Sequence, residues 1–466
     1  MRKTRIICTL GPASTNSDTI RQMIAAGAEI FRLNMSHAEH DWVREIVPRG
    51  RALARELGRE VAILLDTQGP AIRTGILPNE LPLAVGDILE ITVRGAKSAE
   101  PKSITVNYDE LIDDVSLGDT ILLDNGVMQL RVLAKGDNRI RCAVLTAGTL
   151  GSHRHVNLPG VHVNLPAMTE KDRADVSLGM ELGVEFVALS FARQRRDLDE
   201  LRDFLKQGGS AAAVVAKIES AEAVRQLDEM IRGADAVLIA RGDLGIECPM
   251  EELPIVQRRI VKSCLHIGRP VIVATHLLES MVENPVPTRA EITDVANAVF
   301  EQADAMMLTG ETTSGRYPVE CVKVLDRVAR RIERSGGAGY AHDALLENAR
   351  QKTVAAAVAL ANSLARSKLI VFTRRGTMAR TVANSRPQHA PIFAFTPDEC
   401  VCRQLLLCWG THPVRIEFTD DPNATIEAAE KYLRAEKLIL PNDKLVIISD
   451  VRAGVGRFDC VQLRDV

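Results

Sequence analysis

The chain has 466 residues, which is too long for one ordinary hydrophobic core and predicts about three domains. Its hydrophobic content of 46% and charged content of 26% are typical of a soluble globular protein. An aromatic content of 3% argues against the stacking surfaces that bind single-stranded nucleic acid, and a net charge of -3 gives no sign of a polyanion-binding protein.

Apolar runs that alternate with helical patterns predict parallel strands. Before residue 70 these runs are RIICTL, EIFRLN and EVAILLD, and after about residue 168 they are FVALSF, VVAKI, AVLIARG, PVIVAT and AMMLTG. Continuous apolar strands are typical of parallel sheets that are buried on both faces. Three runs and five runs together give the eight strands of a TIM (β/α)8 barrel. An open doubly wound sheet would show the same alternation, but we favour the barrel.

Residues 70–167 interrupt this pattern and predict an inserted domain. Short alternating runs such as ILEITV, SITVNY and RIRCAVL are separated by Gly, Asp and Asn, and Asn125-Gly126 is a strong hairpin signal. We expect a small antiparallel β-barrel here, placed as a lid over the C-terminal face of the barrel. The barrel domain itself would comprise residues 1–69 and 168–337.

Residues 338–466 predict a third, C-terminal α/β domain. Alternation restarts there with a helix, VAAAVALANSLA, and the strands LIVFT, PIFAF, VRIEF and LVIIS, over about 130 residues, which is enough for a separate core. A loop between a strand and a helix comprises Thr373, Arg374, Arg375, Gly376 and Thr377. Its N–H groups and arginines could hold a phosphate, but an ordinary loop with solvated arginines explains it equally well.

The nine cysteines and the N-terminal segment indicate the cellular compartment of the protein. The cysteines are scattered, and their only close pair, Cys400 and Cys402, has no matching second pair for zinc, so we expect reduced thiols. No apolar run approaches the ~20 residues of a membrane span, and the N-terminus lacks a signal-type segment. We therefore expect a cytoplasmic protein.

Polar residues follow the predicted barrel strands at the end where TIM barrels place their active sites. In chain order they are Arg32, Asn34, Ser36, Asp66, Thr67, Ser190, Lys217, Glu219, Asp243, Thr275 and Thr309. Few of these residue types suit a buried core. Their position therefore predicts a chemical site.

Glu219 and Asp243 suit magnesium, which one or two carboxylates usually hold together with water and substrate oxygens. Lys217, Arg32 and Arg73 would supply positive charge for a phosphorylated substrate, because phosphoryl transfer is catalysed mainly by positioning and charge stabilisation. Lys217 and Glu219 could also be a structural ion pair that closes the barrel, and each residue taken singly favours that interpretation. The set as a whole favours a site for a divalent metal and an anion.

Nine strings of the sequence resemble the pyruvate kinase family over essentially the whole chain. They are, in order, RKTRIICTLGPAS, RLNMSH, LLDTQGPAIRTG, VNLPGVHVNLPAMTEKD, AKIES, ARGDLGIE, ATHLLESM, PTRAEITDVANAV and MMLTGETTSGRYP. The resemblance implies a three-domain glycolytic enzyme, a phosphotransferase that moves the phosphoryl group of phosphoenolpyruvate to ADP and gives pyruvate and ATP.

The resemblance also implies roles for single residues. Lys217 would be catalytic and stabilise the transferring phosphoryl group and the enolate, while Glu219 and Asp243 would bind Mg2+ or Mn2+. The substrate carboxylate would lie against Gly242, Asp243 and Thr275. Arg32 would contact the phosphate, and Arg32 and Thr275 would also be catalytic. The nucleotide would be contacted by Arg73, Lys171 and Asn34.

Three positions near the predicted site depart from the family pattern. The family binds potassium through oxygens that match Asn34, Ser36, Asp66 and Thr67. Potassium-dependent members carry a glutamate, and many independent members a lysine, where this chain has Ala71, so we expect potassium to bind here but more weakly. His276 replaces a frequent glutamine and is expected to pack, and Thr309 replaces a frequent serine while keeping a hydroxyl for proton relay.

The resemblance further implies a homotetramer and a sugar-phosphate or nucleotide effector at the loop from Thr373 to Thr377. Members usually have serine where Arg375 stands and arginine or lysine where Thr377 stands, so the identity of the effector is left open.

Two other functions compete with the kinase. A Mg-dependent lyase or aldolase of pyruvate-like substrates on a similar barrel would need the two carboxylates, but not Lys217, Lys171 or the lid. A non-catalytic relative that serves as a sensor or scaffold should have lost a catalytic residue, and none is lost here. We therefore favour the kinase.

Overall fold

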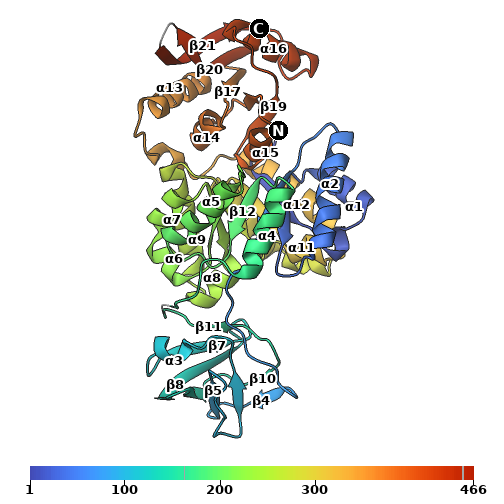
Figure 1. The fold of residues 1–466 in the computed structure, drawn as a ribbon. Coiled ribbons are helices and arrows are strands. Elements are labelled where there is room, and N and C mark those ends of the chain that lie inside the picture. The colour runs from blue at the N-terminus through green and yellow to red at the C-terminus, as the bar shows by residue number, and fades with distance from the viewer. Residues whose placement is uncertain (162, 454–455) are drawn as a thin grey trace.

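The computed structural model describes residues 1–161, 163–453 and 456–466, and a closed barrel of eight parallel strands lies at its centre (Figure 1). Around the barrel the strands follow the order β1-β16-β15-β14-β13-β12-β3-β2. Their bounds are β1 Arg5–Thr9, β2 Ile30–Asn34, β3 Ala62–Asp66, β12 Phe186–Leu189, β13 Ala213–Ile218, β14 Ala236–Ala240, β15 Val271–Ala274 and β16 Ala305–Leu308. The eight apolar runs of the sequence are these strands. The barrel prediction is confirmed and the open sheet is excluded.

The barrel strands are apolar on both faces because each face packs against a different apolar layer. In β1, for example, Ile7 belongs to one buried cluster, while Ile6 and Cys8 belong to another, which also contains helix residues such as Ile20. The surrounding helices are α1 Ser17–Ala26, α2 His40–Glu56, α4 Glu170–Glu181, α5 Arg195–Gln207, α6 Ala221–Arg225, α7 Leu227–Gly233, α8 Arg241–Glu247, α9 Leu253–Ile267, α10 Arg289–Phe300, α11 Gly310–Thr313 and α12 Pro318–Glu333. None of the helices in the described part of the chain is both long and apolar enough to cross a bilayer.

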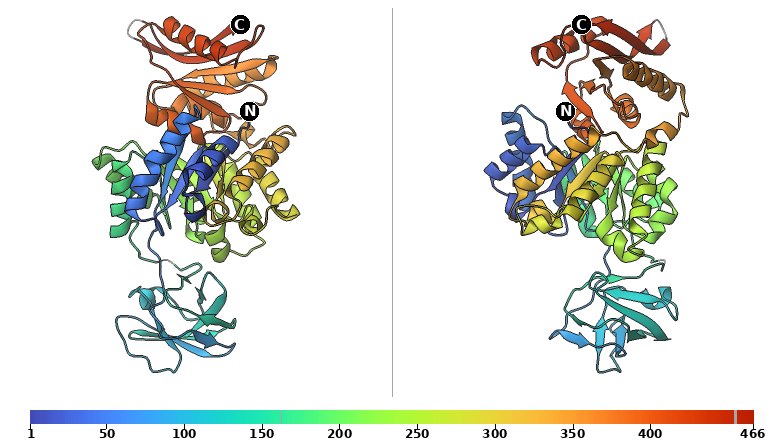
Figure 2. Two further views of the ribbon diagram at one scale, coloured as in Figure 1. Left: turned by 90° about the vertical axis from the view of Figure 1, so that its right-hand side faces the viewer. Right: turned by 180° about the vertical axis from the view of Figure 1, so that it is seen from behind.

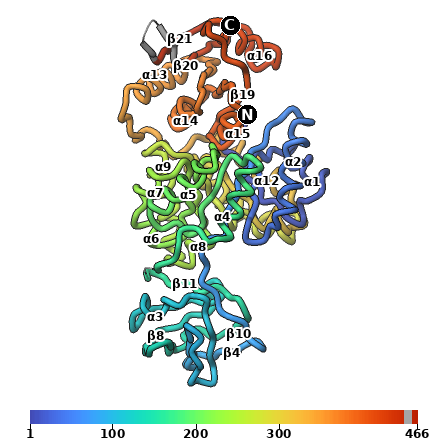
Figure 3. The backbone as a smooth tube through the Cα atoms, in the orientation of Figure 1, coloured from blue at the N-terminus to red at the C-terminus, as the bar shows by residue number. Residues whose placement is uncertain are grey.

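The predicted inserted β unit is present between β3 and α4. Six of its strands form a sheet in the order β11-β7-β8-β9-β5-β6, and β10 pairs with β4. Every pair is antiparallel except β5 and β6. The bounds are β4 Leu81–Leu83, β5 Ile88–Thr92, β6 Ser103–Thr105, α3 Leu111–Asp114, β7 Thr120–Leu123, β8 Met128–Gly136, β9 Arg139–Val144, β10 Gly148–Leu150 and β11 Val156–Asn157. Figure 3 follows the chain from the barrel into this unit and back.

The turn predicted at Asn125-Gly126 joins β7 and β8 and approaches the barrel. Asn125 has a φ of 56° and Gly126 a φ of 86°, which are left-handed values that Asn and Gly tolerate. A Cβ atom placed on Gly126 would lie 3.4 Å from Cγ2 of Ile246 in α8. The tip of this hairpin therefore packs against the helix that follows β14.

The C-terminal unit contains a five-stranded sheet in the order β19-β18-β17-β20-β21. The α/β class that the sequence predicts for this part of the chain is therefore confirmed. Its elements are α13 Ala349–Ser363, β17 Ser367–Phe372, α14 Thr377–Asn384, β18 Ile392–Thr396, α15 Glu399–Gln404, β19 Thr411–Arg415, α16 Pro422–Ala435, β20 Lys444–Ala453 and β21 Gly456–Asp465. β19 begins three residues before the expected run VRIEF and contains Pro413, which an edge strand accepts because it needs fewer backbone donors. β21 is antiparallel to β20 and is absent from the prediction.

The inserted unit and the C-terminal unit lie at opposite ends of the barrel (Figures 1 and 2). Leu406 and Leu407 of the C-terminal unit belong to the apolar cluster inside the barrel. Arg5, the first residue of β1, donates from Nε to the Cys408 carbonyl (3.1 Å), and Asp304, just before β16, pairs with Arg386 (2.7 Å). The C-terminal unit thus occupies the N-terminal ends of the strands, and their C-terminal ends remain for the inserted unit.

A partly buried carboxylate, Glu29, holds the first strand near that junction. It pairs with Arg2 (2.5 Å) and Arg5 (2.6 Å) and accepts from the Ile6 amide (3.0 Å). Burial alone would raise the pKa of Glu29, but Arg2 and Arg5 outweigh it and the net pKa is lowered. A lowered pKa adds stability that is fully present above the unfolded-state value of about 4.3 and is lost as the pH falls further.

We expect Glu29→Gln to reduce the free energy of unfolding by about 3 kcal/mol at pH 7, because it leaves two arginines without their shared anion. Urea unfolding measures this difference. It should shrink as the pH falls below about 4.3, where the wild-type carboxylate loses its charge. The exposed Glu251→Gln is the matched control and should be neutral at every pH. If the difference in the free energy of unfolding between Glu29→Gln and the wild type stayed constant with pH, the Glu29 charge would not be the source of the stabilisation.

Candidate active site

A buried lysine brings three barrel strands together at their C-terminal ends. Lys217 Nζ, near the end of β13, lies 3.1 Å from Asp66 Oδ1 at the end of β3 and 2.8 Å from Glu219 Oε1. It also donates to Ser190 Oγ (2.7 Å), which directly follows β12. The ammonium is therefore held by oxygens on three sides, with only 10% of its side chain exposed.

Burial alone would lower the pKa of Lys217, but Asp66 and Glu219 outweigh it and raise the net pKa. The side chain is consequently a fixed positive charge at neutral pH and cannot act as a base. A cation that is held in place before a substrate arrives needs no reorganisation to stabilise a developing anion.

Asp66 fixes a second cation, Arg32, on the neighbouring strand. Arg32 Nε lies 2.6 Å from Asp66 Oδ2, and its Nη1 donates to Thr9 Oγ1 (3.1 Å). Burial would raise the pKa of Asp66, but Lys217 and Arg32 outweigh it, so the net pKa is lowered and the carboxylate stays ionised. Asp66 thus sets the spacing between the two positive charges.

The carboxylates of Glu219 and Asp243 suit a divalent cation. Burial raises the pKa of Glu219 to about 7, with Lys217 acting against the rise and Asp243 adding to it. Asp243, in the first turn of α8, makes no hydrogen bond or ion pair with its side chain among the described residues. A divalent cation between these carboxylates would offset their repulsion, so the residues present fit Mg2+.

No group of three or more His, Cys, Asp or Glu side chains in the described part of the chain is arranged to hold a metal. Two carboxylates are nevertheless the usual protein share of a magnesium site, because water and substrate oxygens supply the rest.

A strained turn after β15 places the Thr275 hydroxyl beside α8. Thr275 and His276 have φ values of 66° and 51°, in a left-handed region that costs a β-branched residue about 1–3 kcal/mol. The Gly242 amide donates to Thr275 Oγ1 (2.8 Å). The turn therefore joins two residues that were assigned to the substrate carboxylate.

Arg241 holds this turn in place, and sequence reasoning did not assign it a role. It is buried, and its Nε donates to the carbonyls of Ala274 (3.1 Å) and Thr275 (3.2 Å). Its Nη1 lies 2.7 Å from Asp294 Oδ2 in α10. The position directly after β14 was the only signal in the sequence, because the partners lie 33 and 53 residues away.

The candidate nucleotide lysine is also fixed. Lys171 Nζ donates to the Met35 carbonyl (2.6 Å) and to Asp175 Oδ2 (2.7 Å), one turn further along α4. Asp175 is buried, and its other oxygen lies 2.7 Å from His40 Nε2. Since Met35 follows β2 directly, the tether brings Lys171 to the strand end that carries Asn34. The i, i+4 spacing of Lys171 and Asp175 was visible in the sequence, but His40 was not.

The four candidate potassium ligands lie on two adjacent strands. Asn34 stands opposite Asp66 in the register of β2 and β3, and Ser36 and Thr67 follow these strands. The Ser36 amide donates to Asn34 Oδ1 (3.3 Å), and Thr67 Oγ1 donates to the Ala188 carbonyl (3.1 Å). Since Asp66 is already paired with two cations and Ala71 supplies no charge, the oxygens fit a weakly held monovalent ion.

Arg73 lies in the inserted unit. Its Nη1 donates to the His153 carbonyl (3.0 Å), and among the described residues it makes no ion pair with the Asp66 cluster. At the end of β16, the Thr309 amide and hydroxyl both donate to Glu311 (2.7 and 3.3 Å). The structure therefore gathers the other candidate residues on the barrel and leaves Arg73 on the opposing unit.

The loop from Thr373 to Thr377 joins β17 to α14, as expected. It borders a cavity of about 480 Å3, in which the Arg374 guanidinium lies 5.1 Å from the Phe418 ring centre. Ser449, which also lines the cavity, has a buried hydroxyl without a hydrogen-bond partner among the described residues. The cavity thus offers a hydroxyl and arginines to a ligand.

Comparisons with known proteins agree over both ends of the chain. Residues 1–322 match the family model "Pyruvate kinase, barrel domain", and residues 351–463 match "Pyruvate kinase, alpha/beta domain". The chain is 40% identical over 464 residues to the pyruvate kinase of Geobacillus stearothermophilus, covering 97% of this chain and 78% of the relative. It is 38% identical over 471 residues to plastidial pyruvate kinase 3 of Arabidopsis thaliana, covering 100% and 82%. The crystal structure of a pyruvate kinase from Cryptosporidium parvum matches with a TM-score of 0.94 at 32% identity, covering 100% and 96%.

Proposed function

The chain belongs to the pyruvate kinase family, and we propose that Lys217, Glu219 and Asp243 form the reaction centre of this phosphotransferase. The reaction of the family transfers the phosphoryl group of phosphoenolpyruvate to ADP and gives pyruvate and ATP. The observation that carries the assignment is the buried Lys217 ammonium, which two carboxylates hold at the strand ends. A lyase or aldolase would not need this lysine, and the comparisons do not favour one.

The mechanism follows from charges that are fixed before the substrate binds. Arg32, held by Asp66, would contact the phosphate of phosphoenolpyruvate. Lys217 would face the transferring phosphoryl group and the enolate oxygen, so its charge gains most in the transition state. The Thr275 hydroxyl, together with Gly242, would orient the substrate carboxylate.

Glu219 and Asp243 would hold Mg2+ or Mn2+, which supplies positive charge to the phosphate and carboxylate oxygens of the substrate. The protein's own task is to keep both carboxylates ionised and pointed at one place. Lys217 contributes to this for Glu219, because its charge opposes part of the rise in pKa that burial causes, and a bound divalent cation would favour the ionised form further. Thr309, hydrogen-bonded to Glu311, keeps the hydroxyl proposed for proton relay to the enolate.

We expect Asp243→Asn to raise the Mg2+ concentration for half-maximal ATP formation at least about tenfold, because a charged ligand is lost. Initial rates from phosphoenolpyruvate and ADP, with Mn2+ binding followed by calorimetry, measure the effect. Asp228→Asn, an exposed carboxylate on α7, is the matched control. Unchanged Mg2+ dependence in Asp243→Asn would remove this residue from the metal site.

The family is generally dependent on potassium as well as magnesium, and we propose a weak potassium site at Asn34, Ser36, Asp66 and Thr67. The support is the register that places Asn34 beside Asp66, together with the absence of a lysine that could replace the ion at Ala71.

Restoring the carboxylate should strengthen this site. We expect Ala71→Glu to lower the potassium concentration for half-maximal activity about fivefold, the effect of one unit charge near an ion in a wet site. Rates are measured in sodium-free buffer over a potassium titration, with the uncharged Ala71→Gln as control. Equal responses in both variants would show that charge at this position does not reach the ion.

On the nucleotide side we propose Lys171, Asn34 and Arg73 as contacts of ADP and ATP. The support is the tether of Lys171 to Met35 and Asp175, which fixes an ammonium beside the end of β2. Arg73 would approach from the inserted unit, whose hairpin tip already packs against α8.

The domain boundaries, the location, the oligomeric state and the effector are also part of the proposal. We propose the division into a barrel domain (1–69 and 168–337), an inserted lid (70–167) and a C-terminal domain (338–466), and a cytoplasmic homotetramer, which sedimentation velocity would test. The cavity beside Arg375 would take a sugar-phosphate or nucleotide effector. Rates with a panel of such compounds, repeated with Arg375→Ala, would identify it.

A further inference from the structure

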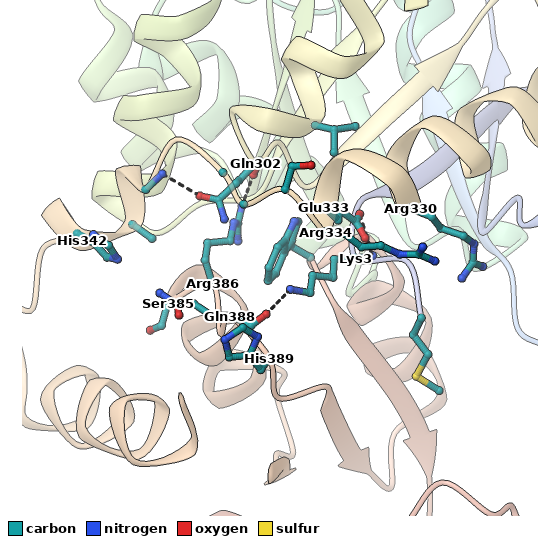
Figure 4. Close-up of a pocket in the computed structure, with 18 residues that line it drawn as sticks. Lys3, Gln302, Arg330, Glu333, Arg334, His342, Ser385, Arg386, Gln388 and His389 are labelled. Carbon is teal, nitrogen blue, oxygen red and sulfur yellow. Dashed lines mark hydrogen bonds between the residues drawn. The ribbon is translucent and has the colours of Figure 1, made fainter. Parts of the chain in front are cut away.

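A second, larger cleft of about 850 Å3 lies between the barrel and the C-terminal unit (Figure 4). Glu333 and Arg334, at the end of α12, face it from the barrel, and Arg386 and His389, after α14, face it from the C-terminal unit. Lys3 of the N-terminal segment lies between them. The cleft is thus at the N-terminal ends of the barrel strands, away from the Lys217 cluster and from the Arg375 loop.

The lining is rich in cations, and its one carboxylate is already engaged. Both oxygens of Glu333 accept from the Lys3 amide (3.0 and 2.9 Å), and one of them also accepts from the Thr4 amide (2.8 Å). Neither the Lys3 ammonium nor the Arg334 guanidinium makes an ion pair among the described residues. The cleft therefore presents two cations, Lys3 and Arg334, that have no ion pair in the described part of the chain, whereas Arg330 and Arg386 of the same lining are paired with Asp326 and Asp304.

Two buried donors in the wall also lack acceptors. Arg386 is 5% exposed and Trp409 4% exposed, yet Arg386 Nε and Trp409 Nε1 have no hydrogen-bond partner among the described residues. A buried donor without a partner costs about 1–3 kcal/mol, so such groups usually mark a missing acceptor. Lys3 Nζ and the Arg386 guanidinium lie 4.8 and 5.2 Å from the Trp409 ring centre, which adds cations to the same wall.

The electrostatics of Lys3 agree with an absent anion. Burial lowers the pKa of Lys3, and the opposing effect of Glu333 does not restore it. A negatively charged ligand next to the ammonium would stabilise its charged form.

We propose that this cleft binds a small polyanion, with phosphate or carboxylate groups, that bridges the barrel and the C-terminal unit. Arg334 would contact it from the barrel and His389 from the C-terminal unit, and Lys3 would donate from the floor, beside the buried Arg386 and Trp409. Such a ligand stabilises the arrangement of the two units by its own binding free energy.

Calorimetric titration of the full-length protein with inorganic pyrophosphate and, separately, with citrate tests this site and distinguishes a phosphate from a carboxylate ligand. Saturating phosphoenolpyruvate without ADP occupies the strand-end site during the titration. We expect the double variant Arg334→Gln/His389→Gln to weaken binding of the preferred probe at least about tenfold, because two charge-assisted contacts are lost. Both side chains are exposed and make no hydrogen bonds among the described residues, so the fold should be kept.

Two controls isolate the cleft. Arg327→Gln removes the same charge from an exposed position of α12 outside the cleft, and Arg375→Gln removes a charge from the C-terminal loop. Arg327→Gln should bind the probe as the wild type does, and Arg375→Gln should retain the binding event that the double variant loses. If Arg327→Gln weakened probe binding as much as the double variant does, the effect would come from the overall charge of the protein. If only Arg375→Gln lost binding, the anion would bind at the loop. Either result, or no binding of either probe at millimolar concentration, overturns the proposal.

Discussion

Lys217→Met should reduce the turnover of ATP formation at least about 10³-fold while phosphoenolpyruvate still binds with nearly wild-type affinity. The physical reason is that, in the proposed mechanism, the ammonium would stabilise charge that develops only as the phosphoryl group leaves, whereas Arg32, held by Asp66, would remain to bind the phosphate. Steady-state kinetics give the turnover, and quenching of intrinsic fluorescence gives the affinity.

The controls for this variant address its side effects. Lys217→Met leaves Asp66 paired with Arg32, but Glu219 loses its cation, so the thermal midpoint must be measured beside the kinetics. Lys206→Met, on the exposed face of α5, is the matched control and should change neither quantity. Near-normal turnover in a folded Lys217→Met protein would refute the proposed reaction centre.

Arg241→Gln should lower turnover about 10²-fold although Arg241 touches no substrate in this assignment. The strained turn at Thr275 depends on the guanidinium that binds two of its carbonyls, and a misplaced orienting group costs about this much in rate. The free energy of unfolding should fall by about 2–3 kcal/mol, less than for a fully buried pair because Asp294 remains 35% exposed.

A positioning role for Arg241 has a signature that mere destabilisation lacks. Since Thr275 would orient the substrate carboxylate in the proposed mechanism, the KM for phosphoenolpyruvate should rise while the KM for ADP stays constant. Arg258→Gln removes an exposed arginine of α9 whose partner, the buried Glu301, keeps its hydrogen bond from Gln257, and it serves as the control. Equal changes of both KM values in Arg241→Gln would indicate a general loss of structure.

The sequence alone predicts the barrel well because its strands are buried on both faces. An interior strand such as Val271–Ala274 has no polar position, so the run of apolar letters marks the element directly. The two edge strands of the C-terminal sheet were harder to predict. β19 carries Pro413 and half-exposed residues, and β21 contains the charged residues Asp459, Arg464 and Asp465, so neither shows a continuous apolar run.

The candidate site was predictable where a residue acts by its own charge and not where it acts through a distant partner. Lys217, Glu219 and Asp243 stand out because charge follows an apolar strand. His40 and Arg241 do not, since their roles appear only when the fold brings Asp175 and Asp294 to them. Sequence separation hides such pairs, whatever the residue types.

The first barrel strand reaches from one functional end of the molecule to the other. Arg5 at its start binds the carbonyl of Cys408 in the C-terminal unit, and Thr9 at its end accepts from Arg32 beside Asp66. Four residue steps of ~3.3 Å put these contacts only about 13 Å apart on one stiff, fully buried segment. The strand therefore connects the C-terminal unit directly to Arg32. A change in the position of the C-terminal unit on the barrel could alter the position of this arginine, which would contact the phosphate, through β1 alone.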